Sequence, residues 1–196
     1  QSITAAESDN PFYCCFEGGM LTLNAFIRKV PDRVVYWGTS GQRITDSYHF
    51  DACCMKELLD YSRLLHGKDI RGQLTPPSFE DIKTNIQFHY DTIRKYASST
   101  GRSIYSFGWL LDIARCIYTL RTGKIISKTA AGEWALQNCL FHNITALETA
   151  LEVRKNPQKY LESAELQALS GKLGNAIRQY ADVLEKELKT TSFVGG

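Results

Sequence analysis

Residues 103–122 read SIYSFGWLLDIARCIYTLRT and form the most apolar helical pattern in this chain of 196 residues. Apolar side chains lie on nearly every side of a helix drawn through this stretch, which is typical of a helix surrounded by others. Gly123 follows, where a left-handed glycine commonly ends a helix. The stretch therefore predicts a central, buried helix around which the other helices pack.

Further helical patterns lie on both sides of this stretch. Ser78, with Asp81 three residues later, is typical of a helix start, and apolar residues then recur at helical spacing. Ser127 and Asn143 are capping residues at the start of two more helical patterns. A last helix is predicted over residues 162–189, where leucines and other apolar residues recur at steps of three and four.

The first part of the chain has a different pattern. Short apolar runs separated by glycine and proline turn residues predict two or three strands, over residues 12–16, 20–26 and 34–37. Residues 50–65 follow with a helical pattern. We therefore expect a mainly helical (α+β) protein, with a β segment and linker over residues 1–75 and a bundle of about five helices over residues 76–196.

Composition limits the classes of function. The net charge of +2 is too small to predict nucleic-acid binding, and no run of eighteen apolar residues could span a membrane. The six cysteines include two adjacent pairs and lack the spaced pairs of a zinc site, so we expect a cytoplasmic protein with no metal site built from cysteines.

Two charged residues lie inside the most apolar pattern. Asp112 and Arg115 are three residues apart, where an unpaired buried charge is costly, so a salt bridge is one interpretation. The other is that Arg115 offers its planar guanidinium to a phosphate. Lys128 lies in the first turn of a predicted helix, beside backbone N–H groups that favour an anion, although a solvated surface lysine is an equal alternative.

Other candidate residues have simpler interpretations. Trp134 could be an aromatic platform for a substrate, but a tryptophan on the apolar face of a helix is more often core. The glycine-containing segment at residues 37–41 lacks the spacing and lysine of a phosphate loop, so we interpret it as a turn. Asp46 and Asp51 are five residues apart and do not form the Asp-x-Asp pair that would direct two carboxylates at one Mg²⁺.

A family resemblance rests on two segments. Residues 122–136 read TGKIISKTAAGEWAL, and residues 64–71 read LLHGKDIR ahead of Pro76-Pro77. Both resemble the C-terminal domain, with its preceding linker, of aminoglycoside nucleotidyltransferases, particularly the streptomycin/spectinomycin adenylyltransferases. The similar stretches cover about residues 50–190, and the first segment is the specific one.

The resemblance implies an antibiotic-resistance enzyme that transfers AMP from Mg²⁺-ATP to a hydroxyl of a small molecule. Arg115 and Lys128 match the family's nucleotide-binding positions, and Trp134 is a candidate for substrate contact. A further nucleotide-contacting tyrosine of the family falls near Arg154 here, which departs from the family's pattern. The positions of the family's drug-contacting acidic residues are occupied here by Gly101 and Tyr105, neither of which is acidic. This difference argues against streptomycin as the substrate.

The family's Gly-Ser loop and Asp-x-Asp metal site are not found in residues 1–60. The chain is therefore expected to be truncated and inactive as given, with Glu17 the one candidate for the catalytic base. The alternative is a non-catalytic helical interaction module, in which apolar surface near residues 11–40 docks another chain. Exposed strand edges in the β segment also favour association into a homodimer.

Overall fold

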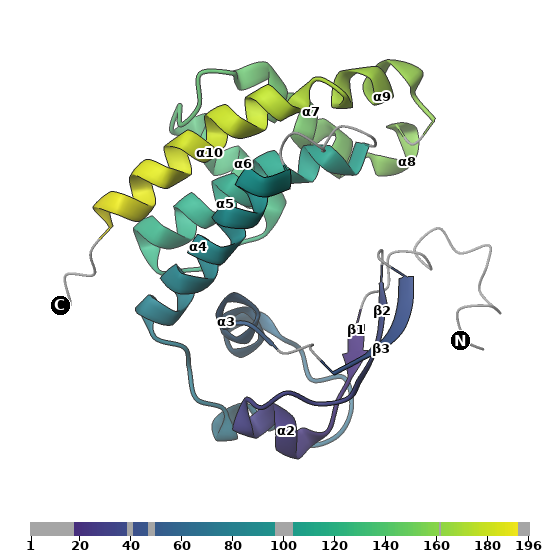
Figure 1. Cartoon of the computed structure of the whole chain (residues 1–196), viewed down its shortest axis with the longest axis vertical. Coiled ribbons are helices and arrows are strands. Elements are labelled where there is room, and N and C mark those ends of the chain that lie inside the picture. Colours follow the sequence, from purple (N-terminus) through teal and green to yellow (C-terminus); the bar gives the residue numbers. More distant parts are fainter. Residues whose placement is uncertain (1–17, 39–40, 47–49, 97–103, 161, 192–196) are drawn as a thin grey trace. The chain divides into compact units, whose positions relative to one another are not determined.

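The computed structural model describes residues 18–38, 41–46, 50–96, 104–160 and 162–191. The chain divides into two compact units, Gln1–Pro76 and Pro77–Gly196 (Figure 1). In their described parts, the first unit contains a small antiparallel sheet with short helices, and the second contains helices. The predicted class, mainly helical with a short β segment ahead of a helical bundle, is confirmed.

The sheet of the first unit has the strand order β1-β2-β3. Its strands are β1 (Gly18–Met20), β2 (Val34–Gly38) and β3 (Gly41–Thr45), and both neighbouring pairs are antiparallel. Val34 and Tyr36 of the central strand are buried, and Val35 between them is exposed because side chains alternate between the two faces. The predicted strand over residues 34–37 is confirmed.

The antiparallel pairing of β2 and β3 extends to the glycines at their facing ends. Gly38, the last residue of β2, pairs with Gly41, the first residue of β3. Residues 39–40 between them lie outside the described residues, so the turn interpretation of residues 37–41 stays a prediction.

The predicted strand over residues 20–26 is wrong beyond Met20. A helix, α2 (Leu23–Arg28), begins there because the Thr22 side chain accepts a hydrogen bond from the Ala25 N–H at 3.3 Å. The backbone N–H of Thr22 in turn donates to the Asp32 carboxylate at 2.6 Å. The predicted strand over residues 12–16 lies outside the described residues.

The helical pattern over residues 50–65 forms α3 (Ala52–Tyr61), which is shorter than predicted. Asp51 caps this helix, since its carboxylate accepts a hydrogen bond from the Cys54 N–H at 2.7 Å. A short 3-10 helix, η2 (Arg71–Gln73), follows in the linker. Arg71 binds the Asp69 carboxylate there and donates to the carbonyl of Ser62 at 3.2 Å, which fixes the linker to the end of α3.

The second unit is built around α5 (Gly108–Thr122). Around it pack η3 (Ile104–Phe107), α4 (Phe79–Tyr96), α6 (Lys128–Gln137), α7 (Ile144–Lys155) and α10 (Leu173–Thr190). The buried residues of α5 are Leu110, Leu111, Ile113, Ala114, Cys116, Ile117, Thr119 and Leu120. Gly123 ends the helix with a φ of 67°, as the sequence predicts, and the central position of this helix is confirmed.

The predicted caps are confirmed. The Ser78 hydroxyl accepts from the Asp81 N–H at 3.1 Å, and the Asp81 carboxylate accepts from the Ser78 N–H at 2.8 Å, which completes a capping box ahead of α4. Ser127 caps α6 and Asn143 caps α7, each by accepting from the N–H three residues later. These helices therefore begin where their side-chain oxygens replace a missing backbone acceptor.

The single last helix predicted over residues 162–189 is wrong, because the chain forms α9 (Ala164–Ser170) and then α10, after a short α8 (Pro157–Tyr160). The break falls at Gly171 and Lys172. Glycine costs about 1 kcal/mol inside a helix relative to alanine. The buried Ser170 hydroxyl also donates to the carbonyl of Gln167 at 2.7 Å, a local bond that competes with a continuous helix.

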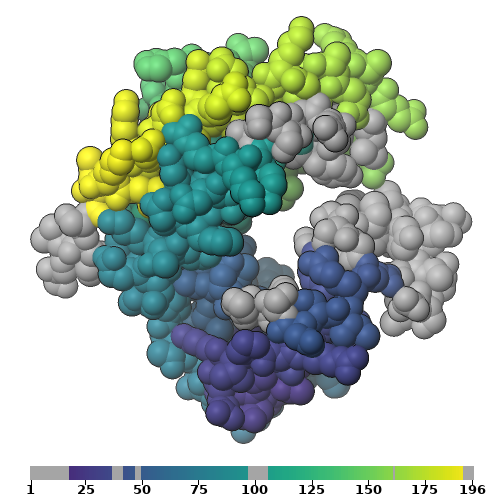
Figure 2. Space-filling view, in the orientation of Figure 1, coloured from purple at the N-terminus to yellow at the C-terminus, as the bar shows by residue number. Residues whose placement is uncertain are grey.

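Ion pairs fix α10 to α4. Arg94 of α4 pairs with Asp182 and Glu185 of α10, and the Lys83 ammonium donates to the carbonyl of Thr191 at 2.6 Å. Figure 2 shows the yellow atoms of α10 bordering the teal atoms of α4. Together with the apolar face of α10, these contacts close the bundle.

Tyr180→Phe is expected to lower the free energy of unfolding by about 1 kcal/mol. The buried Tyr180 hydroxyl donates a 2.5 Å hydrogen bond to the carbonyl of Asn143, ahead of α7, and its ring stacks on Phe141. Urea denaturation followed by far-ultraviolet circular dichroism measures the change. The control is Tyr160→Phe, which removes a surface bond to Glu152 and is expected to cost less than about 0.5 kcal/mol. Equal effects would contradict a role for Tyr180 in docking α10.

Candidate functional site

The surface of α5 is a single stripe of residues at every third position. Between Trp109 and Arg121 the residues that are not buried are Trp109, Asp112, Arg115, Tyr118 and Arg121, and all the others are buried. Residues three apart lie next to each other along a slanting row on a helix. We call these five residues the α5 stripe. It contains charged and aromatic side chains within the otherwise apolar central helix.

Asp112 joins two cations from different helices. Its carboxylate accepts from the Arg115 guanidinium at 3.3 Å and from the Lys128 ammonium at 2.8 Å. The exposed fractions of these side chains are 13% for Asp112, 30% for Arg115 and 28% for Lys128. The cluster has two positive charges against one negative charge, so it retains one net positive charge at a partly desolvated surface.

The segment between α5 and α6 brings Lys128 to Asp112. Asp112 lies ten residues before the end of α5, which is about 15 Å at the rise of an α-helix. Residues 123–127 run back along α5, and Ile125 is buried within this segment. Five extended residues span about 16 Å, which is enough for the return. Lys128 therefore begins α6 beside the middle of α5, and the positive end of the α6 dipole lies next to the cations.

Aromatic pairs lie at the two ends of the α5 stripe. At one end the ring of Trp109 stacks on that of His89 from α4, with centroids 6.3 Å apart and planes at 21°. Toward the other end Trp134 of α6 meets Tyr118 edge to face at 5.2 Å, and the Arg121 guanidinium lies 5.7 Å from the centre of the Trp134 ring. Trp134 is half-buried, and its ring contacts Tyr118 and Arg121 of the stripe.

The other candidate residues fall in different places. Glu17 and Gly101 lie outside the described residues, and so does the side chain of Tyr105. Arg154, at the position of the family's tyrosine, is exposed on α7. The structure therefore brings Arg115 and Lys128 to the same carboxylate and places Trp134 of α6 beside Tyr118 and Arg121 of the α5 stripe. Glu17, the proposed base, lies outside the described residues.

Neither a metal-ligand cluster nor an activated Cys54 thiol is found among the described residues. Within residues 18–191, apart from the undescribed positions, no three His, Cys, Asp or Glu side chains gather closely enough to hold a metal ion. Burial raises the pKa of the Cys54 thiol to about 12, and the nearby Asp51 carboxylate acts in the same direction. A thiol with this pKa is protonated at neutral pH and is a poor nucleophile.

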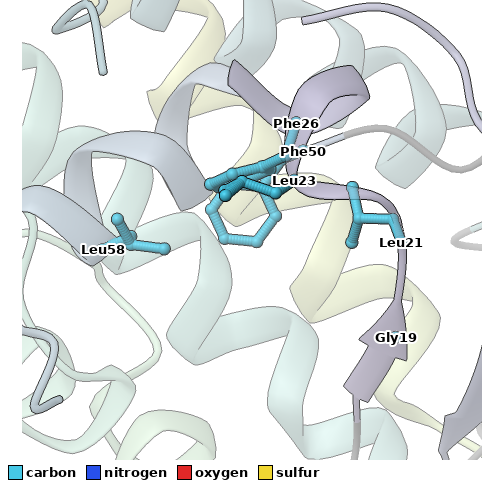
Figure 3. A pocket seen from close by; sticks show the side chains of 6 residues that line it. All are labelled: Gly19, Leu21, Leu23, Phe26, Phe50 and Leu58. Carbon is cyan, nitrogen blue, oxygen red and sulfur yellow. The ribbon is translucent and has the colours of Figure 1, made fainter. Parts of the chain in front are cut away.

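The first unit contains an apolar pocket of about 330 Å³ (Figure 3). It is lined by Gly19, Leu21, Leu23, Phe26, Phe50 and Leu58. Phe26 and Phe50 meet edge to face at 5.5 Å in its wall. None of the lining side chains can ionise or donate a hydrogen bond, so the side chains of the pocket offer shape and apolar surface.

Two features of the site were missed from the sequence. The contact between Asp112 and Lys128 joins residues sixteen positions apart, and the stack of His89 on Trp109 joins two helices. One sequence pattern does indicate the stripe. Trp109, Asp112 and Arg115 follow each other at steps of three, which places them along one slanting row on a helix.

Comparison with known proteins places the site within a known domain. Residues 82–186 match the family model of the aminoglycoside adenylyltransferase C-terminal domain, which is just over half of the chain. The matched region runs from α4 into α10 and includes the whole α5 stripe with Lys128 and Trp134. No curated protein matches the chain. In the described part of the chain, no helix has the length and apolar character needed to cross a membrane.

Proposed function

We propose, from the premise that this chain belongs to the aminoglycoside adenylyltransferase C-terminal domain family, that Arg115 and Lys128 bind the phosphates of ATP. The reaction this site would serve is the transfer of AMP to a hydroxyl of an aminoglycoside-type small molecule. One observation carries the proposal: two cations from different helices converge on one carboxylate and retain a net positive charge.

The geometry of the cluster suits a phosphate group. A guanidinium has five N–H donors, and Arg115 gives an Nη2 hydrogen to Asp112, so its fork can also bind phosphate oxygens. Lys128 adds a compact positive charge beside the first turn of α6, whose backbone N–H groups favour an anion. Asp112 contacts both cations, and its single negative charge leaves the cluster with a net positive charge.

In the proposed reaction, a hydroxyl oxygen of the acceptor forms a bond to the α-phosphorus of ATP, and the bond from that phosphorus to pyrophosphate breaks. The hydroxyl proton passes to a base, and pyrophosphate leaves. Arg115 and Lys128 would stabilise negative charge on the phosphates during this transfer. When bound, Mg²⁺ supplies further charge stabilisation at the phosphates. The sequence contains no Asp-x-Asp pair, so we assign no metal ligand in this chain and route no step through the ion.

Isothermal titration of Mg²⁺-ATP into the full chain tests the proposal. Lys128→Ala and Arg115→Ala are each expected to weaken binding by about tenfold or more, because a hydrogen bond to a charged group contributes about 1.5–3 kcal/mol. The matched control is Lys155→Ala, which removes an ion-paired lysine from the surface of the same unit. The thermal unfolding temperature of each variant is measured alongside the titration, so that a loss of binding can be distinguished from a loss of stability.

Three results would contradict the proposal. The first is the absence of measurable binding of Mg²⁺-ATP to the unmodified chain. The second is an equal loss of affinity in Lys155→Ala. The third is a collapse of thermal stability in Arg115→Ala, which would show that the ion pair with Asp112 serves the fold alone.

A non-catalytic interaction module is the second candidate function, and the sheet of the first unit favours it. Met20, Val35 and Ile44 pair directly across the three strands, and all three are exposed, so they form an apolar row on one face. Sedimentation analysis of the chain and of Val35→Lys tests this candidate. Self-association that the lysine abolishes supports it, and a monomer in both cases contradicts docking of a second copy on this face.

A further inference from the structure

We infer that the stacked pair of His89 and Trp109 holds the flat base of the nucleotide, so that the α5 stripe recognises a whole nucleoside triphosphate rather than its phosphates alone. This inference deepens the proposed function and rests on it, since it requires the phosphates to lie at Arg115 and Lys128. It adds a site for the base at the opposite end of the stripe from Trp134.

The position of Trp109 along α5 supports the inference. Trp109 lies three residues before Asp112 and six before Arg115, on the same stripe. Six residues of α-helix rise about 9 Å and turn the side-chain direction by about 120°, so the stripe winds around α5. A nucleotide has its phosphates and its base at opposite ends of the ribose, so a ligand that follows the winding stripe with its phosphates on the cations has its base toward Trp109.

The burial and the stacking contact of the Trp109 ring also support the inference. The ring is neither buried in the core nor left as an isolated surface side chain, because His89 from α4 stacks on it with nearly parallel planes. Two helices that pack together thus hold the ring in one orientation. Aromatic side chains held in this way bind nucleic-acid bases by stacking on their flat faces.

The aromatic pair at the other end is less suited to a base. Tyr118 meets Trp134 edge to face, and the Arg121 guanidinium lies over the Trp134 ring. Arg121 is itself held by an ion pair with Glu187 of α10. A base that stacked on Trp134 would have to displace these contacts, whereas a base at the Trp109 end would extend an existing stack.

Titration with two ligands on the full chain tests the inference, because ATP and inorganic tripolyphosphate share the phosphates but only ATP has a base. Trp109→Ala is expected to weaken ATP binding by about tenfold and to leave tripolyphosphate binding unchanged. Trp109→Phe keeps an aromatic face and is expected to retain most of the ATP affinity. Lys128→Ala is expected to weaken the binding of both ligands. Trp134→Ala is expected to affect ATP binding no more than tripolyphosphate binding.

The outcomes separate the inference from the proposed function. Equal affinity of the unmodified chain for ATP and tripolyphosphate, or an equal loss of both in Trp109→Ala, overturns the base site and leaves the phosphate site standing. A selective loss of ATP in Trp134→Ala overturns the inference by placing the base at the other end. Binding of neither ligand to the unmodified chain overturns the proposed function itself. The comparison of ATP with tripolyphosphate on the unmodified chain does not depend on any Trp109 variant, so the inference stays testable if Trp109→Ala fails to fold.

Discussion

Gly132→Val is expected to lower the free energy of unfolding of the helical unit by about 3 kcal/mol, since overpacking a core costs roughly this much. Gly132 is buried in α6 where that helix meets α5 and α7. A Cβ atom at this position would lie 2.7 Å from Leu111 Cδ2 and 2.8 Å from Leu151 Cδ2. Both leucines are buried, so neither can move away without disturbing the core.

Urea denaturation followed by far-ultraviolet circular dichroism measures this loss, and Gly108→Ala is the matched control. Gly108 is the first residue of α5, and a Cβ atom there meets nothing within 4 Å. Alanine at Gly108 is therefore expected to leave stability unchanged or to raise it by up to about 1 kcal/mol. A Gly132→Val protein as stable as the unmodified chain would show that α6 does not depend on close approach to α5.

Asp112→Asn is expected to have opposite effects on stability and on ligand affinity. The carboxylate is mostly buried and binds two cations, so its loss is expected to lower the free energy of unfolding by about 1–2 kcal/mol. The same change removes the negative charge nearest to the proposed phosphate site. Because unit charges a few ångströms apart near a surface interact by about 1–4 kcal/mol, tripolyphosphate affinity is expected to rise about tenfold.

Denaturation and titration of the same Asp112→Asn sample separate the two effects. Glu133→Gln is the matched control, because Glu133 forms an exposed ion pair with Lys155 that is expected to contribute less than about 1 kcal/mol. A fall in affinity together with stability would mean that the charge of Asp112 is needed to hold the cations in position. No change in affinity would place the phosphate site away from this cluster.

Local interactions explain which parts of the fold were predictable from the sequence. The starts of α4, α6 and α7 follow from capping side chains that bond to N–H groups three residues away, so a short stretch of sequence contains all the partners. The central position of α5 follows from its apolar character on nearly every side. Arg115 and Lys128 were recognisable as candidates because a charge inside an apolar helix and a cation at a helix start both require an explanation.

The wrong predictions arose where competing local patterns were close in strength. Residues 20–26 carry enough apolar side chains for a strand, yet the cap at Thr22 and its bond to Asp32, ten residues away, favour α2. The leucines of residues 162–189 continue at helical spacing across Gly171, so periodicity alone did not show the break between α9 and α10.

The sequence by itself determined the helical class, the caps and the two cations of the candidate site, because each depends on residues within one turn or one helix. Only the tertiary structure decided that Lys128 meets Asp112 and that His89 stacks on Trp109. These contacts depend on the path of residues 123–127 back along α5 and on the packing of α4 against it. The physical reason is that periodicity describes the faces of a single helix, whereas the meeting of two helices depends on how the whole core packs.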